Sequence, residues 1–114
     1  MTKKSYQIAG QAAYDKKGMY IQVLNMENTS FMADYFMICS ANSAKQAQSI
    51  ADNVEEKMEE AGYKRYHIEG YKDGKWILLD FGEIIVHVFT HEERAFYDLE
   101  SLWSDVDRIT FKGE

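Results

Sequence analysis

Residues 75–89, which read KWILLDFGEIIVHVF, decide the fold of this chain. Gly82 separates two apolar runs of strand length, Lys75–Phe81 and Glu83–Phe89, and a glycine between two such runs favours a β-hairpin. Successive side chains of a strand point to opposite faces of the sheet, and in both runs both alternating sets are largely apolar. The hairpin must therefore be covered on both of its faces.

Further strands are expected on the N-terminal side of this hairpin. Tyr66–Glu69 precedes it, and Asp73-Gly74 is typical of a two-residue type I′ turn that would join the two. Earlier in the chain, the β-rich segment Tyr20–Met26 and the nearly continuous apolar run Tyr35–Ser40 predict two more strands. The second of these runs is apolar enough to be buried on both faces.

Capping signals and helical periodicity predict the helices. Ser43 followed by Gln46 is a capping box, and Thr90 followed by Glu93 is a second one. After Ser43, apolar residues recur at spacings of three and four and form one stripe, while the opposite side of that segment is acidic. The expected helices are Ser5–Lys16, Ser43–Ala61 and a last one from Thr90 to Leu102 or Trp103.

The order of these elements, α-β-β-α-β-β-β-α, defines the fold class. The strand–helix–strand passage around residues 43–61 predicts one right-handed crossover, and the hairpins predict antiparallel neighbours. We therefore expect an α/β fold in which a mixed five-stranded sheet packs with about three helices. A single domain would span residues 1–104, and residues 105–114 would form a polar tail.

Composition narrows the classes of function. The chain has 114 residues, with 19 acidic against 13 basic residues and a formal net charge of −6. This charge disfavours binding to free nucleic acid and favours a basic partner. The single cysteine, Cys39, fits a reducing cytoplasm, and neither a secretion signal nor an apolar run of membrane-spanning length is expected.

Patterns of catalytic or metal-binding residues are weak. His87, His91 and Glu92 would align as metal ligands only on one helix, whereas His87 falls in an expected strand. Cys39 lies in an apolar run, where a cysteine is more often a core residue than a nucleophile. Asp80 lacks the second strand carboxylate, two residues away, that a two-metal nucleotidyl-transfer site needs. We expect no catalytic residue, metal or cofactor, with a residual nucleotide-binding or nucleotidyl-transfer enzyme as the alternative.

A binding surface is the remaining candidate. Trp76, Leu78 and Asp80 share one face of the first hairpin strand, and Glu69 and Tyr71 lie on the neighbouring arm. An aromatic anchor beside carboxylates that accept hydrogen bonds from Arg or Lys is typical of a patch for a basic protein. Two alternatives remain open: Trp76 is an ordinary core residue, or this face pairs with a second copy of the chain as a homodimer.

The sequence also contains a series of strings that form one pattern. They are ADYFMICS at 33–40, QSIADNV at 48–54, EG at 69–70, WILLDFGEIIVHVF at 76–89, Arg94, YDLE at 97–100 and LW at 102–103. Together they resemble the ribosomal silencing factor family, RsfS, also called Iojap, over nearly the whole chain as far as Trp103. The resemblance implies a nucleotidyltransferase-like α/β fold without the active site of the transferases.

The resemblance also implies a function. Family members bind the large ribosomal subunit through its ribosomal protein fourteen and block association with the small subunit, which represses translation when nutrients are short. The contact residues carried over onto this chain are Trp76, Leu78 and Asp80, with Glu69, Tyr71 and His87 as neighbours. The residues assigned to the core are Ile77, Leu79, Val86, Val88, Leu99 and Leu102.

Overall fold

The computed structural model describes residues 4–29 and 33–113 of the protein. The strands are β1 (Met19–Asn25), β2 (Tyr35–Ala41), β3 (His67–Glu69), β4 (Trp76–Asp80), β5 (Ile84–Thr90) and β6 (Arg108–Thr110). The helices are α1 (Ser5–Asp15), α2 (Ala44–Glu60) and α3 (His91–Tyr97), followed by a 3₁₀ helix, η1 (Leu99–Trp103). The strands form one sheet in the order β3-β4-β5-β2-β1-β6. The expected mixed α/β fold class is confirmed.

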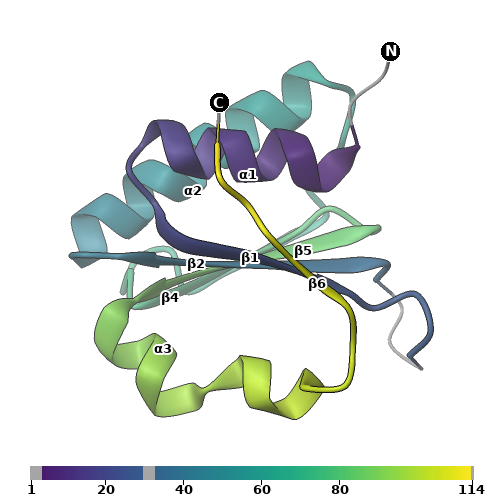
Figure 1. Ribbon diagram of the computed structural model, residues 1–114. Coiled ribbons are helices and arrows are strands. Elements are labelled where there is room, and N and C mark those ends of the chain that lie inside the picture. Colours follow the sequence, from purple (N-terminus) through teal and green to yellow (C-terminus); the bar gives the residue numbers. More distant parts are fainter. Residues whose placement is uncertain (1–3, 30–32, 114) are drawn as a thin grey trace.

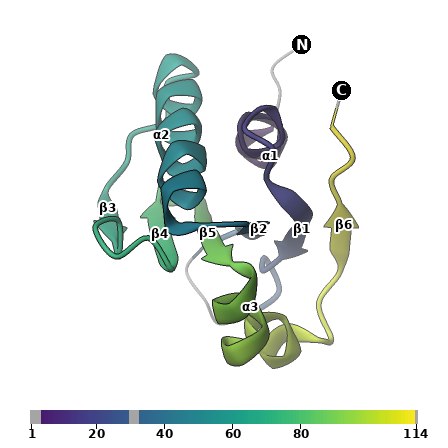
Figure 2. The same ribbon diagram turned by 90° about the vertical axis from the view of Figure 1, so that its left-hand side faces the viewer.

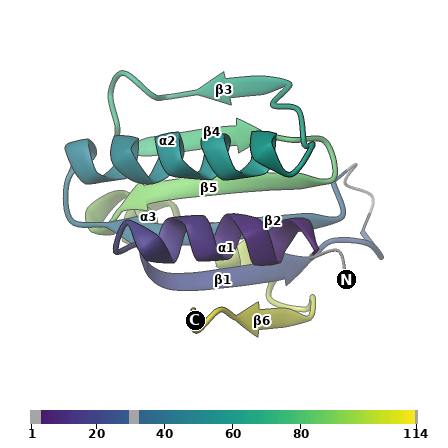
Figure 3. The ribbon, with the colours of Figure 1, turned by 90° about the horizontal axis from the view of Figure 1, so that it is seen from above.

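The sheet lies between two helical layers (Figure 1). Its β2 and β5 strands run parallel, and every other neighbouring pair is antiparallel. Helices α1 and α2 lie side by side over one face (Figure 3), while α3 and η1 lie against the other. The chain thus covers both faces of its central strands, as their two-sided apolar pattern requires.

The larger core fills the space between the sheet and the first two helices. Ile77, Leu79, Val86 and Val88 are fully buried there, which confirms their assignment to the core. Burying a side chain of this kind contributes about 1.5–3 kcal/mol relative to leaving it exposed. The long helix α2 is capped as expected, because the Ser43 hydroxyl accepts a hydrogen bond from the Gln46 backbone N–H at 3.1 Å.

The last helix is shorter than predicted. It ends at Tyr97 because Asp98 adopts the left-handed conformation, with φ of 45°, and the chain continues as the 3₁₀ helix η1. The helical periodicity therefore does not continue past this point, and Leu102 is 70% exposed, so its assignment to the core was wrong. Leu99 does pack against the smaller core on this side of the sheet. The second predicted capping box is also wrong, since the Thr90 side chain makes no capping hydrogen bond.

The connection between β3 and β4 is longer than the predicted two-residue turn. A type I′ turn needs positive φ at both central residues, and Asp73 does not adopt it. Instead, Gly70 and Gly74 have φ of 76° and 75°, and the Gly74 N–H donates to the Gly70 carbonyl at 2.9 Å. These two glycines close a wider loop that still brings β3 alongside β4.

The expected polar tail supplies a sixth strand. Its β6 segment pairs antiparallel with β1, so the predicted number of strands was one too low. Beyond β6 the chain crosses α1 (Figure 1), and the ring of Phe111 packs against Gly10 of that helix. A Cβ atom at Gly10 would lie 2.7 Å from the Phe111 ring, which accounts for a glycine inside α1.

Candidate docking face

Within residues 4–29 and 33–113, no helix covers one part of the sheet on the side of α3. Helix α3 and the 3₁₀ turn after it lie beneath the middle of the sheet, and β3 and β4 lie to one side of them (Figure 2). Register places Glu69 opposite Leu78, and Asp80 opposite Ile85, so these side chains share this face. We call this surface the docking face and define it as Glu69, Trp76, Leu78, Asp80, Ile85, Phe96 and Tyr97.

Trp76 is the most constrained side chain of the docking face. Its ring stacks on Phe89 with centroids 4.8 Å apart and packs on Tyr97 at the same 4.8 Å. Its Nε1–H donates a hydrogen bond to His87 Nδ1 at 3.1 Å. Trp76 is half-buried, so its ring forms a fixed aromatic platform at the boundary between the core and the solvent.

His87 lies beneath this platform. It is only 4% exposed, and its ring makes an edge-to-face contact with Phe36 at 4.9 Å. Burial lowers its pKa from 6.5 to about 4, so the imidazole is neutral at physiological pH. Because Nδ1 accepts the Trp76 N–H, the proton of the neutral ring lies on Nε2, which has no hydrogen-bond partner within residues 4–29 and 33–113. The structure thus places His87 under the docking face and shields it almost completely from solvent.

Carboxylates lie at the other end of the docking face. Asp80 Oδ1 accepts the backbone N–H of Gly82 at 2.8 Å, which holds the carboxylate at the end of β4. Glu69 Oε2 pairs with His67 Nε2 at 2.8 Å, and both side chains are more than half exposed. Leu78 of β4 is half-buried and lies between its two register partners, Glu69 of β3 and His87 of β5. The face therefore combines an aromatic end with an acidic end.

Tyr71 does not belong to this group. Its hydroxyl donates to Asp52 Oδ1 of α2 at 2.8 Å, and its carbonyl accepts from Gln48 Nε2 at 2.8 Å. The hydrogen bond to Asp52 raises the pKa of the Tyr71 hydroxyl. Because α2 covers the opposite face of the sheet, the structure separates Tyr71 from the other expected contact residues.

Three residues of the docking face were not expected from the sequence: Ile85 on β5, and Phe96 and Tyr97 on α3. Phe96 is 79% exposed and Tyr97 is 47% exposed, and their rings meet edge to face at 5.1 Å. Helical periodicity placed Phe96 beside an apolar, inward-facing stripe, and this stripe ends where α3 ends. No sequence pattern revealed the exposure of Phe96 and Tyr97, because it follows from the early end of α3, a helix that buries none of its side chains.

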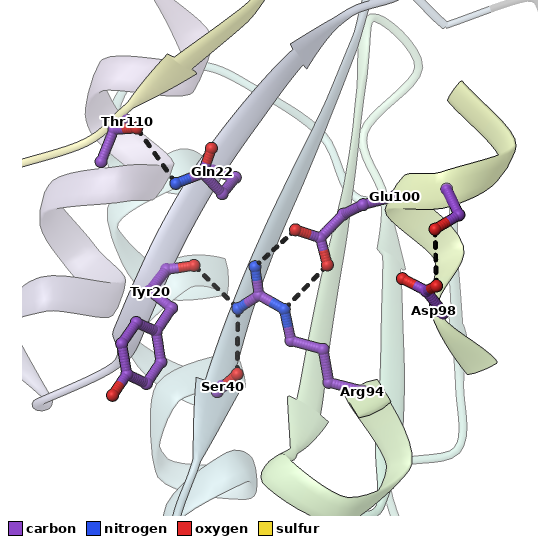
Figure 4. A network of polar contacts seen from close by, with 8 residues as sticks. Tyr20, Gln22, Ser40, Arg94, Asp98, Glu100 and Thr110 are labelled. Atoms are coloured by element: carbon purple, nitrogen blue, oxygen red, sulfur yellow. Dashed lines mark hydrogen bonds and ion pairs between the residues drawn. The ribbon is translucent and has the colours of Figure 1, made fainter. Parts of the chain in front are cut away.

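A hydrogen-bonded clamp holds α3 and η1 against the sheet (Figure 4). Arg94 donates from Nε and Nη2 to the two carboxylate oxygens of Glu100, both at 3.0 Å. Its Nη1 donates to the Tyr20 carbonyl at 2.7 Å and to the Ser40 hydroxyl at 2.9 Å. The Arg94 and Glu100 side chains are only 12% and 21% exposed. This clamp joins α3 and η1 to β1 and β2, and so fixes the helix that carries Tyr97 over Trp76.

The groups considered for catalysis lie apart from one another. His91 Nε2 pairs with Asn42 Oδ1 at 2.9 Å, whereas His87 pairs with Trp76. Cys39 is fully buried in β2, and this burial raises the pKa of its thiol to about 12, so the thiolate does not form at neutral pH. The described part of the chain contains no cluster of three or more His, Cys, Asp or Glu side chains that could hold a metal ion. Nor does that part contain a helix with the length and apolarity needed to cross a membrane.

Comparison with solved structures supports the fold. A crystal structure of a Bacillus halodurans protein superimposes with a TM-score of 0.81 at 40% identity, over 92% of this chain and 95% of that one. A crystal structure of a Chromobacterium violaceum protein superimposes with a TM-score of 0.87 at 28% identity, over 99% and 94% of the two chains.

Comparison with known sequences identifies the relatives. The ribosomal silencing factor RsfS of Bacillus subtilis is 43% identical over 106 residues, which are 92% of this chain and 90% of that protein. The RsfS of Halalkalibacterium halodurans is 42% identical over 107 residues, which are 94% and 92% of the two proteins. The chloroplastic protein Iojap of Zea mays is a longer relative, 33% identical over 87% of this chain and 43% of its own.

A family model matches the whole length of the chain. The model described as ribosomal silencing factor during starvation, RsfS, matches residues 1–114. This match includes both the strands that carry the docking face and the helices that surround it. Taken with relatives above 40% identity at high coverage, it confirms the resemblance expected from the sequence strings. The chain belongs to the RsfS family of ribosomal silencing factors.

Proposed function

We propose that this protein silences ribosomes by occupying a surface. It binds the large ribosomal subunit through ribosomal protein fourteen, and the bound protein sterically blocks the small subunit and so represses translation. The observation that carries this proposal is the docking face, which joins exposed aromatic side chains of α3 at one end to carboxylates of β3 and β4 at the other. The proposed activity makes or breaks no covalent bond, and it places the protein in the cytoplasm.

The composition of the docking face supports a basic protein as the partner. Phe96 and Tyr97 supply exposed aromatic area, and half-buried Leu78 and Ile85 supply apolar surface between the strands. Carboxylates near this surface accept hydrogen bonds from Arg or Lys, and the net charge of −6 attracts a basic partner from a distance.

Sedimentation with purified ribosomal subunits tests the proposal. The wild-type protein is expected to co-migrate with the large subunit alone and to bind isolated ribosomal protein fourteen. Phe96→Ala removes a side chain that is 79% exposed, so the fold is expected to persist while affinity falls about tenfold or more. Tyr14→Ala, which removes a 45% exposed aromatic ring on α1, across the sheet from the docking face, is the control.

A charge reversal tests the acidic end in the same assay. Asp80→Lys is expected to weaken binding most at low salt, where electrostatic attraction is least screened. Glu56→Lys makes the same charge change on α2, across the sheet, and is expected to have little effect. A wild-type protein that stays at the top of the gradient, or equal losses from all four variants, would contradict the proposal.

A homodimer through the same face is compatible with this function, because a dimer would have to open before it binds the subunit. Measurement of solution mass across a dilution series, for wild type and Phe96→Ala, decides whether the docking face also joins two copies. No observation on the described residues favours the nucleotidyl-transfer alternative. Magnesium-dependent binding of ATP or GTP by the purified protein would revive it.

A further inference from the structure

One buried polar group needs a physical explanation. His87 is 4% exposed, and its Nε2–H has no hydrogen-bond partner among the described residues. A buried donor without an acceptor destabilises the folded state, and an apolar side chain of similar size would avoid this cost. What distinguishes His87 from such a side chain is its other ring nitrogen, which accepts the Trp76 Nε1–H.

This hydrogen bond determines how the Trp76 ring is oriented. The ring packs on Phe89 and on Tyr97, with interplanar angles of 28° and 49°, and contacts between ring faces do not depend on which edge of the indole carries Nε1. A hydrogen bond does not tolerate the flip, because Nε1 lies on only one edge of the ring and must point at its acceptor. His87 therefore selects one orientation of Trp76 that packing alone does not specify.

The orientation is passed on to the exposed part of the docking face. Tyr97 packs on Trp76 with an interplanar angle of 49°, and Phe96 packs on Tyr97 at 90°. Together these contacts connect His87, which is 4% exposed, with Phe96, which is 79% exposed. A change in the tilt of Trp76 would therefore move both rings of α3.

We infer that His87 is a positioning residue of the docking face: its Nδ1 holds the Trp76 indole, and through it Tyr97 and Phe96, in the arrangement that a partner protein meets. The inference rests on the proposed function for the role of that face. A preorganised surface binds more tightly because less side-chain freedom is lost on binding. His87 acts through Trp76 and does not contact the partner itself.

Two substitutions at one position separate positioning from support of the fold. His87→Leu fills the site with an apolar side chain but offers no acceptor. His87→Asn keeps an oxygen on Cγ, where histidine carries Nδ1, and so keeps an acceptor for the indole. The readouts are the indole N–H resonance and the ring-to-ring contacts of Trp76 in NMR spectra, together with affinity for the large subunit. Trp103, the other tryptophan of the chain, serves as the internal reference.

In His87→Leu, we expect the Trp76 indole resonance to shift, its ring contacts with Tyr97 to weaken, and affinity to fall about threefold to tenfold. In His87→Asn, the resonance and ring contacts stay close to wild type, and affinity returns to within about twofold of wild type. A role confined to folding predicts the opposite relation, in which affinity follows the fraction of folded protein in every variant.

The inference is overturned if His87→Leu binds the large subunit as wild type does while its spectrum shows that the indole hydrogen bond is gone. Should His87→Leu fail to fold, Trp76→Phe removes the donor instead: its ring contacts with Tyr97 and its affinity should then fall as expected for His87→Leu, and wild-type affinity in this variant would overturn the inference. If the wild-type protein itself does not bind the subunit, the proposed function fails. The NMR contacts between Trp76 and Tyr97 still decide, in that case, whether His87 orients the ring.

Discussion

Acid should destabilise this protein through His87. Its pKa is lowered to about 4 by burial, whereas the unfolded chain titrates near the ordinary value of 6.5. Between these two pH values the unfolded state binds a proton that the folded state excludes, so stability falls as pH falls through this range. At about 1.4 kcal/mol for each pH unit, the loss by pH 4 is about 3 kcal/mol.

The structure supplies the cause of this effect. Desolvation accounts for the lowered pKa, and rings from three sides enclose the imidazole: Phe36, Trp76 and Phe89. Protonation of Nδ1 would also point two donors at each other, because the Trp76 N–H already occupies that nitrogen. A charged His87 therefore loses both hydration and its one hydrogen bond.

Urea unfolding at a series of pH values measures the effect. The free energy of unfolding is compared between wild type and His87→Leu from about pH 7 to about pH 4, so that the other titrating groups cancel. The free energy of unfolding of wild type minus that of the variant is expected to fall by about 3 kcal/mol from about pH 7 to about pH 4, whichever protein is the more stable at neutral pH. Two profiles that run parallel to within about 0.5 kcal/mol would refute the assigned burial of a neutral imidazole.

Three further predictions concern the loop between β3 and β4, the Arg94 clamp and the packing of the C-terminal segment on α1. Gly70→Ala should lower the free energy of unfolding in urea by about 3 kcal/mol or more, because φ is 76° and the new Cβ would collide with a β4 carbonyl. Gly62→Ala is the control: φ is 93° but the space around it is open, so the loss should be only about 1 kcal/mol. Arg94→Lys keeps the charge but loses the two parallel hydrogen bonds to Glu100, so backbone hydrogen exchange in α3 and η1 should accelerate about tenfold or more. Exchange at the wild-type rate would contradict this role of the clamp. Phe111→Ala should lower the free energy of unfolding by about 2 kcal/mol. Gly10→Ala is destabilising alone but should restore part of that loss in the double variant, because its Cβ takes up space left by the Phe111 ring. Additive losses would contradict the packing of the tail on α1.

Much of the fold could be predicted because its signals are local. Alternation in residues 75–89 correctly divided Trp76, Leu78 and Asp80 from Ile77 and Leu79, since a strand has only two faces. The apolar stripe after Ser43 correctly predicted α2, because helical spacing and a capping hydroxyl are both properties of adjacent residues. The sequence strings also predicted the family, which the comparisons confirmed.

The candidate site depended more on contacts between distant residues. Alternation put Trp76 and His87 on one face, but only the tertiary structure shows that His87 is buried against Trp76 and Phe36 while Phe96 is exposed. Tyr71 was assigned to this site by its position next to β3, and the structure instead bonds it to Asp52 of α2. Periodicity could not foresee the left-handed Asp98 that ends α3.

The sequence by itself determined strands β1 to β5, helices α1 and α2, and the face to which the side chains of β4 point. Those features follow from backbone geometry and from the spacing of neighbouring apolar residues. Only the tertiary structure decided what covers each face, because covering depends on where chain segments return after long connections. The clamp from Arg94 to Tyr20 and the pairing of β6 with β1 each join residues more than 70 positions apart, and no local pattern encodes such a distance.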